Sequence, residues 1–197
     1  MIAAFVGHGA SLSGGALGPL IDGCDLVVRL HDWHWQPEAD FGRRYDYGVL
    51  PGPWLARAMT QQRRSPLRGW LVYGWQPHHR QGLPEGAAYI DCGTLHARLR
   101  QTGARCRVGI PAPTRGLAAL YMIATLPGIT EIRAFGCDAI EAGSAETYAY
   151  HPALGVTDHD TTRRHDMARE RQAVDWIAET SGCAIRFARL PHLEQAA

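Results

Sequence analysis

Short apolar runs bounded by Gly, Pro or polar residues recur along the chain and predict a series of buried strands. These runs occupy Ile2–Val6, 25–30, 70–73, 88–90, 106–110, 129–135 and Ala184–Phe187. Stretches with helical spacing lie between them at 95–101, 117–126 and 163–180. Thr114 or a neighbour can cap the second of these helices, and Pro127-Gly128 can end it. The rest of the chain, including the long segment 31–69, is predicted to be irregular.

Strands that alternate with helices predict an α/β fold with a mostly parallel central sheet and helices on its faces. We expect a single Rossmann-like domain over residues 1–197, because the sequence contains no internal repeat, low-complexity tract or linker. Ligands of such sheets bind beyond the carboxyl ends of the strands. This rule places the glycine-rich segment 7–18, the turn 111–116 and the segment after Gly136 along one edge.

Composition narrows the class of protein. The chain of 197 residues is 46% hydrophobic, which excludes a disordered protein, and its net charge of +1 gives no indication of nucleic acid binding. All 20 basic residues are arginine and asparagine is absent, a usage that indicates a GC-rich, bacterial genome. The five scattered cysteines favour buried free thiols over disulfides or a zinc site. Without a signal peptide or an apolar stretch of membrane-spanning length, we expect a cytoplasmic protein with no integral membrane segment.

The most specific pattern lies in residues 6–31, where a strand ends in a glycine-rich loop and a second strand follows. Amide groups in such a loop can cradle a phosphate, and a tight turn without a ligand is the alternative. The stretch resembles the large sialylmotif of the animal sialyltransferases, glycosyltransferase family 29. The matching residues are Val6, Gly7, Leu12, Gly18, Pro19, Ile21, Asp22, Asp25, Val27 and Arg29, followed by Asp40 and Gly42.

This resemblance assigns roles to the matching positions. Asp22, Asp25 and Arg29 would be structural, and Gly9 would lie against the sugar donor. The two family asparagines that contact the donor phosphate and ribose are replaced by His8 and His31. A histidine can still donate a hydrogen bond to a phosphate through a ring nitrogen. The alternative is that both histidines only pack at strand ends.

A second stretch, from Pro113 to Gly136, resembles the small sialylmotif of the same family. It reads P-T-R-G-L before the predicted helix and F-G after the next strand. The resemblance implies that Thr114, Gly116 and Gly136 line the nucleotide pocket, with the helix start directed at the donor. A helix N-terminus offers free N–H groups and the positive end of a dipole. An ordinary capped core helix is the alternative.

A third stretch, residues 148–170, is rich in His and Asp. His165 and Glu170 form the H-x-x-x-x-E pattern of the very small sialylmotif, in which the histidine is the catalytic base. On one helix, five residues set two side chains about 140° apart, so we expect the two not to face each other. Glu170 would then anchor the helix while His165 faces the site. Tyr150-His151 resembles the short third motif, which implies that His151 contacts the donor phosphate, with His159 as the alternative.

Together the resemblances imply a glycosyltransferase that moves sialic acid, or the related sugar acid Kdo, from a CMP-sugar to a glycan hydroxyl with inversion. The implied partners are the nucleotide-sugar and the glycan. No metal and no further cofactor are expected, because hydrogen bonds can stabilise a departing monophosphate. Trp33, Trp35 and Trp54 could stack on the acceptor sugar or form a satellite core cluster.

Two other functions are compatible with the sequence. A metal-dependent hydrolase could use His151, His159, His165 and Asp160, because Asp and His are good ligands for zinc or iron. A nucleotide- or glycan-binding module without catalysis could keep the fold after the exchange of asparagine for histidine.

Overall fold

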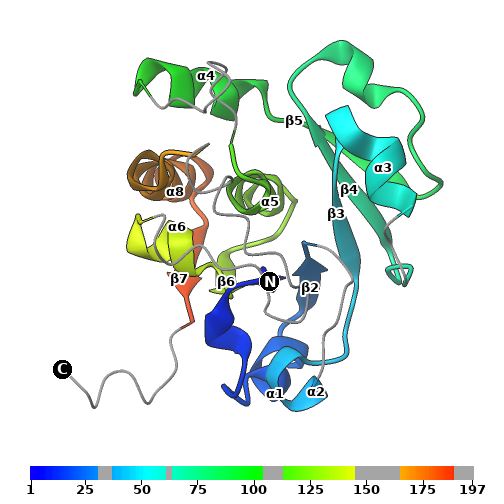
Figure 1. Ribbon diagram of the computed structural model, residues 1–197, viewed down its shortest axis with the longest axis vertical. Helices are drawn as coiled ribbons and strands as arrows, with labels where there is room; N and C mark the ends of the chain where they lie inside the picture. The colour runs from blue at the N-terminus through cyan, green and yellow to red at the C-terminus, as the bar shows by residue number, and fades with distance from the viewer. Residues whose placement is uncertain (31–36, 61–63, 104–112, 145–164, 189–197) are drawn as a thin grey trace.

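The described strands form one parallel sheet in the order β5-β4-β3-β2-β1-β6-β7, a seven-stranded arrangement (Figure 1). The computed structural model describes residues 1–30, 37–60, 64–103, 113–144 and 165–188. The strands are β1 (Ile2–Val6), β2 (Leu26–Arg29), β3 (Tyr47–Pro51), β4 (Gly69–Gly74), β5 (Ala87–Asp91), β6 (Glu131–Phe135) and β7 (Ala184–Phe187). This sheet, flanked by helices, confirms the predicted α/β fold.

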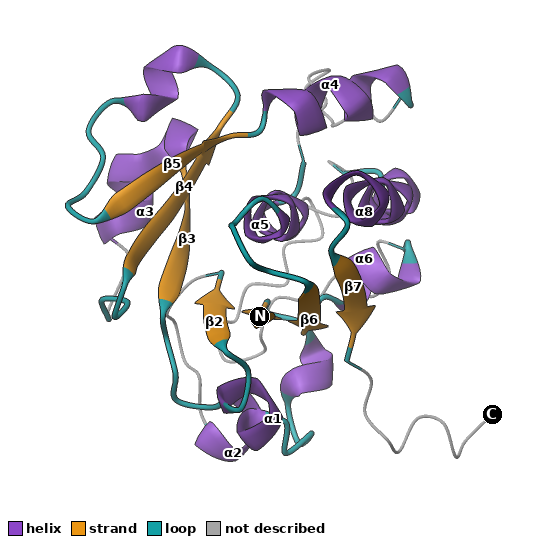
Figure 2. Ribbon diagram, turned by 180° about the vertical axis from the view of Figure 1, so that it is seen from behind, coloured by secondary structure: helices purple, strands orange, loops and turns teal. Residues whose placement is uncertain are grey.

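Helices cover both faces of the sheet (Figures 1 and 2). One face carries α4 (Gly93–Gln101), α5 (Arg115–Ala124), α6 (Asp138–Ala142) and α8 (Met167–Ser181). The other carries the short elements η1 (Ala10–Leu12), α1 (Gly18–Asp22), α2 (Glu38–Phe41) and α3 (Leu55–Thr60). Two single turns, η2 (Gly52–Trp54) and η3 (Pro77–Arg80), follow β3 and β4.

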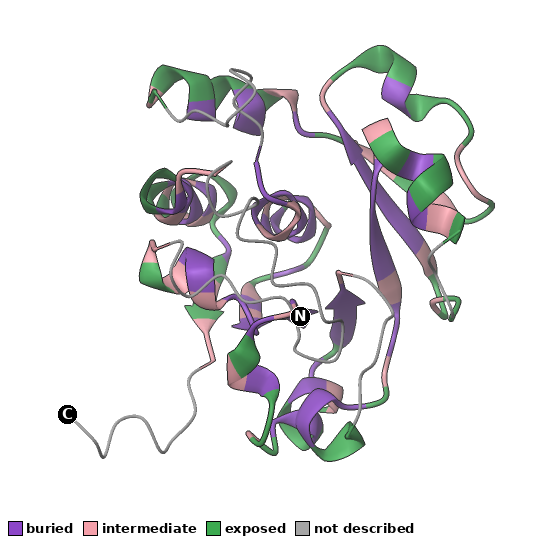
Figure 3. Cartoon of the chain, in the orientation of Figure 1, coloured by how far each residue is buried: buried purple, intermediate pink, exposed green. Residues whose placement is uncertain are grey.

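The interior strand β1 shows why apolar runs form these strands. Ala3 and Phe5 pack into the core beneath α5, whereas Ala4 and Val6 pack into the core beneath α1. Because successive side chains point to opposite faces, a strand covered on both sides must be apolar at every position. The helix α5 is likewise buried almost all round, as Figure 3 shows by its largely buried ribbon.

Some of the elements predicted from the sequence have the same bounds in the structure, and others differ. Two predicted strands, Ile2–Val6 and Ala184–Phe187, have the same bounds as β1 and β7. The prediction of an irregular segment at 31–69 was wrong in part, because β3 lies within it and pairs with β2 and β4. The predicted strand at 106–110 lies outside the described residues.

Carboxylates on loops tie the strands together. Asp25 accepts the N–H of Ile2 at 2.8 Å, and Asp22 accepts the N–H groups of Arg43 and Arg44 at 2.8 and 2.9 Å. Asp46 is 3% exposed and accepts the N–H of Val27 at 2.8 Å. These bonds fix the amino-terminal edge of β1, β2 and β3.

Two arginines complete this network. Arg44 donates to the carbonyls of Asp22, Cys24 and Asp25, and it forms an ion pair with Asp46 at 2.8 Å. Arg29 is fully buried and donates through Nε to the carbonyl of Arg44 at 2.7 Å. Burial lowers the pKa of the Arg29 guanidinium to about 10, which leaves it charged at neutral pH.

Four of the five cysteines lie in the described part of the chain. Cys24, Cys92, Cys137 and Cys183 are buried free thiols, as expected for these four. Burial raises the pKa of the Cys92 thiol to about 12, so this thiol is unreactive at neutral pH. Within the described ranges, no helix has both the length and the apolar character needed to cross a bilayer.

Replacing Asp46 with alanine should lower the free energy of unfolding by about 2–3 kcal/mol, because it leaves the buried N–H of Val27 unpaired and removes a charge-assisted bond. Urea unfolding monitored by tryptophan fluorescence measures the change. The control is Glu38→Ala, which removes an exposed partner of Arg43 and should change stability little. Equal effects of the two substitutions would contradict the structural role of Asp46.

Candidate functional site

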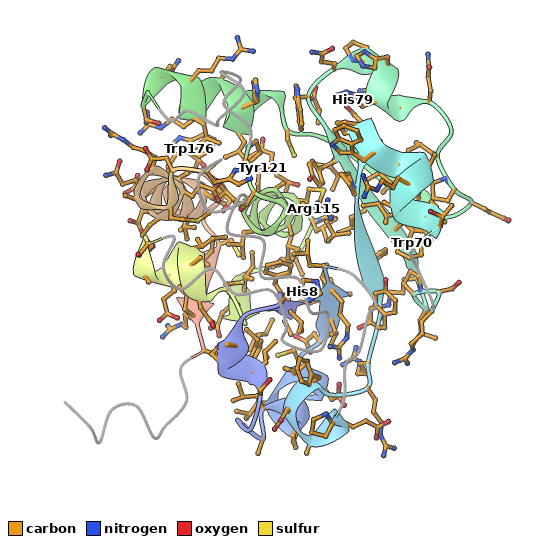
Figure 4. The ribbon with its side chains drawn as sticks, viewed as in Figure 1. His8, Trp70, His79, Arg115, Tyr121 and Trp176 are labelled. Atoms are coloured by element: carbon orange, nitrogen blue, oxygen red, sulfur yellow. The ribbon has the colours of Figure 1, made fainter. Side chains whose placement is uncertain are left out.

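The carboxyl-terminal edge of β1, β6 and β7 brings together segments that are far apart in the sequence. β1 and β6 pair in parallel with Val6 opposite Phe135, so His8 and Gly136 follow two adjacent strand ends. A helix that leads into a parallel strand starts at the edge where the strands end. The starts of α5 and α8, which precede β6 and β7, therefore lie at this edge with Thr114 and His165. Figure 4 shows His8 and Arg115 in the central part of the molecule.

The glycine-rich loop after β1 is closely packed against the turn after β6. Gly7 donates its N–H to the carbonyl of Phe135 and Gly9 to that of Gly136, each at 2.8 Å. A Cβ on Gly7 would lie 2.5 Å from the carbonyl oxygen of Gly136, so a larger residue cannot fit. Gly9, which the resemblance placed against the sugar donor, thus uses its amide in a hydrogen bond within the protein.

Asp138, the first residue of α6, fixes the other end of this loop. Its carboxylate accepts the N–H of Ser11 at 3.0 Å and the hydroxyl of Ser11 at 2.5 Å. A Cβ on Gly9 would lie 2.5 Å from the same carboxylate. The sequence analysis missed Asp138 because its partner is 127 residues away. Gly7 and Gly9 are therefore explained by close packing.

Gly136 ends β6 with φ of +63°, a left-handed conformation that favours glycine. A Cβ at this position would lie 2.5 Å from Cδ1 of Leu12. Gly116, in the first turn of α5, would place a Cβ 3.0 Å from Cδ1 of Ile140. Both glycines lie at the carboxyl-terminal edge, and both allow close packing between neighbouring elements.

The start of α5 is capped from two directions. Thr114 is the N-cap residue, and its hydroxyl accepts the N–H of Leu117 at 3.1 Å. Glu170 from α8 accepts the N–H of Thr114 at 2.8 Å and the hydroxyl of Thr114 at 2.5 Å. The predicted cap is therefore confirmed. The N–H groups of Thr114 and Leu117 are both occupied within the protein.

Glu170 also approaches His165. The distance from its Oε1 to Nδ1 of His165 is 3.5 Å, and the two side chains are 3% and 16% exposed. The expectation that they do not face each other was wrong, because His165 precedes the helix. Asp166 is the N-cap of α8 and has extended backbone angles, so helical spacing does not apply to His165.

Burial raises the pKa of the Glu170 carboxyl to about 8, and the two bonds from Thr114 partly oppose this shift. A carboxyl with such a pKa can hold or release a proton near neutral pH. The arrangement joins an imidazole and a carboxyl at a site of low exposure, which is suited to proton transfer.

The remaining site residues predicted from the sequence lie elsewhere in the fold or outside the described residues. Asp22 and Asp25 belong to the network at the amino-terminal edge, away from His165. Arg29 ends β2 opposite Val6, and its side chain reaches that network through the carbonyl of Arg44. His31, His151, His159 and Asp160 lie outside the described residues, as do Trp33 and Trp35. In the part of the chain that is described, no group of three or more His, Cys, Asp or Glu side chains is arranged to hold a metal ion.

Comparison with known proteins supports the fold. No protein-family model matches the sequence, and no curated protein matches it. The crystal structure of a mammalian sialyltransferase matches with a TM-score of 0.59 and 16% identity, over 95% of this chain and 68% of that chain. The chain has a sialyltransferase-like α/β fold. A second match is a mammalian sialyltransferase in complex with Gal-beta-1-3GalNAc-ortho-nitrophenol, with a TM-score of 0.57 and 16% identity, over 95% of this chain and 69% of that chain.

Glu170 should make the stability of the protein depend on pH. Its pKa is raised from 4.5 to about 8 on folding, so the folded protein keeps a proton that the unfolded chain releases. The contribution of Glu170 to stability is therefore fully present below pH 4.5 and declines as the pH rises through about 8. In Glu170→Gln this decline should be absent, so the variant should gain stability relative to the wild type between pH 5 and pH 9. Urea unfolding of both proteins across that range measures the difference, and a constant difference would contradict the raised pKa.

Proposed function

We propose that the protein is a glycosyltransferase that moves a sialic acid, or a related 2-keto sugar acid such as Kdo, from a CMP-sugar to a glycan hydroxyl. The observation that carries the proposal is the convergence of His8, Thr114 and His165 at one edge of a sialyltransferase-like fold. These three residues come from the three stretches that resemble sialylmotifs. The burial of Glu170 beside His165 adds a pair of groups suited to proton transfer.

In this reaction His165 takes the proton of the acceptor hydroxyl as its oxygen attacks the anomeric carbon. The bond from that carbon to the phosphate breaks, and CMP leaves with the bonding electrons. A single displacement of this kind inverts the anomeric configuration. Histidine titrates near neutral pH, which suits it to act as a general base. His8 donates a hydrogen bond to the departing phosphate, which as a monophosphate needs no divalent ion for its stabilisation.

Trp54 is the described residue best suited to contact the acceptor glycan. It ends η2, directly after β3, so it lies at the same edge of the sheet as His8. Its side chain is 62% exposed, which excludes the alternative of a satellite core cluster for this tryptophan. β3 is two strands from β1, or about 10 Å along the edge of the sheet. An exposed indole at this separation can stack on a sugar ring of the acceptor.

Binding of the donor is tested by a thermal-shift screen with CMP, CMP-sialic acid, CMP-Kdo, UDP-sugars and divalent metal ions. A ligand at 100 times its dissociation constant stabilises a protein by ~2.7 kcal/mol. We expect stabilisation by CMP and by one CMP-sugar. Stabilisation by a metal ion alone would favour the hydrolase, and CMP binding without transfer or donor hydrolysis would favour a binding module.

Replacing His165 with alanine should lower the turnover number by roughly 10²–10⁴-fold, the usual contribution of a positioned general base. Stabilisation by CMP should persist in the variant, because the proposed base does not hold the nucleotide. Release of CMP from the donor, followed in the presence and absence of acceptor, measures the effect. Wild-type turnover in His165→Ala would exclude His165 as the base.

Replacing Trp54 with alanine should raise KM for the acceptor by roughly tenfold, equivalent to about 1.4 kcal/mol of binding, and leave donor hydrolysis unchanged. A β-galactoside panel is a suitable first acceptor set, since a structural neighbour was solved with a galactose-containing glycan. Leu67→Ala is the matched control, because Leu67 is 80% exposed and precedes β4 at the opposite edge. Equal KM values for wild type and Trp54→Ala would remove Trp54 from the acceptor site.

A further inference from the structure

Glu170 is held at both of its carboxyl oxygens. Two hydrogen bonds from Thr114 fix both carboxyl oxygens at the junction of α5 and α8, which pack against each other. The side chain of Glu170 is buried, and the carboxyl has no freedom to turn without breaking one of these bonds. It is therefore a fixed point against which a neighbouring group can be oriented.

His165 is the group that this fixed point orients. The regular part of α8 begins at Met167 and is capped by Asp166, whose side chain accepts the N–H of Arg169 at 3.0 Å. Nothing in the helix geometry forces His165 toward Glu170, yet its Nδ1 lies 3.5 Å from Oε1. This distance is at the outer limit of a hydrogen bond, and contacts between catalytic groups commonly shorten when substrate binds.

We propose that Glu170 is a positioning residue for His165, an inference that rests on the proposed function. The carboxylate accepts the Nδ1 proton of His165, which leaves the Nε2 lone pair for the proton of the acceptor hydroxyl. When the acceptor oxygen bonds to the anomeric carbon, that proton moves to Nε2 and the imidazole becomes a cation. The adjacent carboxylate stabilises this cation, and CMP departs with the electrons of the broken carbon–oxygen bond.

The pair has one form that is competent as a base, with Glu170 ionised and His165 neutral. The form with one more proton, carried by either side chain, is inactive. Other ionisable groups lie on the elements packed around Glu170: Asp166 at the start of α8, Arg115 at the start of α5, and Asp138 and Glu141 in α6. The charge of Asp166 raises the pKa of the Glu170 carboxyl. Turnover should therefore rise with pH as the pair loses its proton.

The test compares Glu170→Gln and Glu170→Ala with the wild type and with Asp46→Asn. Asp46 is a second buried carboxylate that accepts a backbone N–H, so its variant controls for loss of such a group away from His165. The measurements are the pH dependence of turnover, KM for the donor, stabilisation by CMP, and the nitrogen chemical shifts of ¹⁵N-labelled histidine.

We expect Glu170→Gln to lower turnover by roughly tenfold or more and to move the midpoint of the pH profile toward lower pH, with KM and CMP stabilisation unchanged. Glu170→Ala should lose more, because glutamine keeps an acceptor oxygen for Nδ1–H. The wild-type spectrum should show the Nδ1–H tautomer of His165, and Glu170→Ala should lose that preference. Asp46→Asn should change neither the midpoint nor the tautomer.

The proposal is overturned if Glu170→Gln keeps the wild-type midpoint and tautomer, or if it loses CMP stabilisation in parallel with turnover. Either result would make Glu170 a helix anchor alone. If the wild type transfers no sugar, the proposed function fails. The nitrogen spectra then decide separately whether Glu170 sets the tautomer of His165.

Discussion

The carboxylate of Glu170, buried between two helices, is the constraint on which the candidate site depends. A buried ionisable group is costly unless its oxygens are satisfied, so the chain must bring two N–H or O–H groups to it. Thr114 supplies both, and it does so from a position 56 residues away. The start of α5 and the start of α8 are consequently fixed relative to each other. Because α5 is buried almost all round, its position is in turn set by the core of the whole domain.

The same physical device recurs in the rest of the fold. Asp138 accepts Ser11, Asp46 accepts Val27, and Asp40 accepts the N–H groups of Gly14 and Ala16 at 2.6 and 2.8 Å. Each carboxylate satisfies loop or strand-end N–H groups that lack a partner in the sheet. Hydrogen bonds to an ionised acceptor are about twice as strong as those between neutral groups. Loops at both edges of the sheet are thus fixed by charge-assisted bonds. The four described cysteines are buried free thiols and form no disulfide with one another.

Much of this fold could be predicted from the sequence, because the doubly covered strands must be continuously apolar. β1 and β7 were located with the right bounds, and α5 was found from its apolar spacing and its threonine cap. β3 was missed because Tyr47–Pro51 is short and runs directly into Gly52 and Pro53, which are typical of a turn. Its strand character comes from pairing with β2 and β4, which no local pattern reveals.

The candidate site was harder to predict, because its contacts join distant residues. Helical spacing separated His165 from Glu170, and this failed because α8 begins at Met167 with Asp166 as its N-cap, so His165 precedes the helix. The hydrogen bonds from Thr114 to Glu170 depend on the packing of α8 against α5. The sequence of either segment alone does not predict them. The glycines of the loop after β1 suggested a phosphate cradle, whereas Gly7 and Gly9 make close contacts with Gly136 and Asp138.

These contacts change how a phosphate would be bound in the proposed reaction. The start of α5 was expected to offer free N–H groups and the positive end of the helix dipole to an anion. In the structure, Glu170 already places a carboxyl at that position, and Thr114 occupies the N–H of Leu117. A second anion beside this carboxyl would be repelled whenever Glu170 is ionised, which is also the form in which His165 can act as a base. In the proposed reaction the phosphate would therefore rely on the other N–H groups at the start of α5 and on hydrogen-bonding side chains such as His8 at the end of β1.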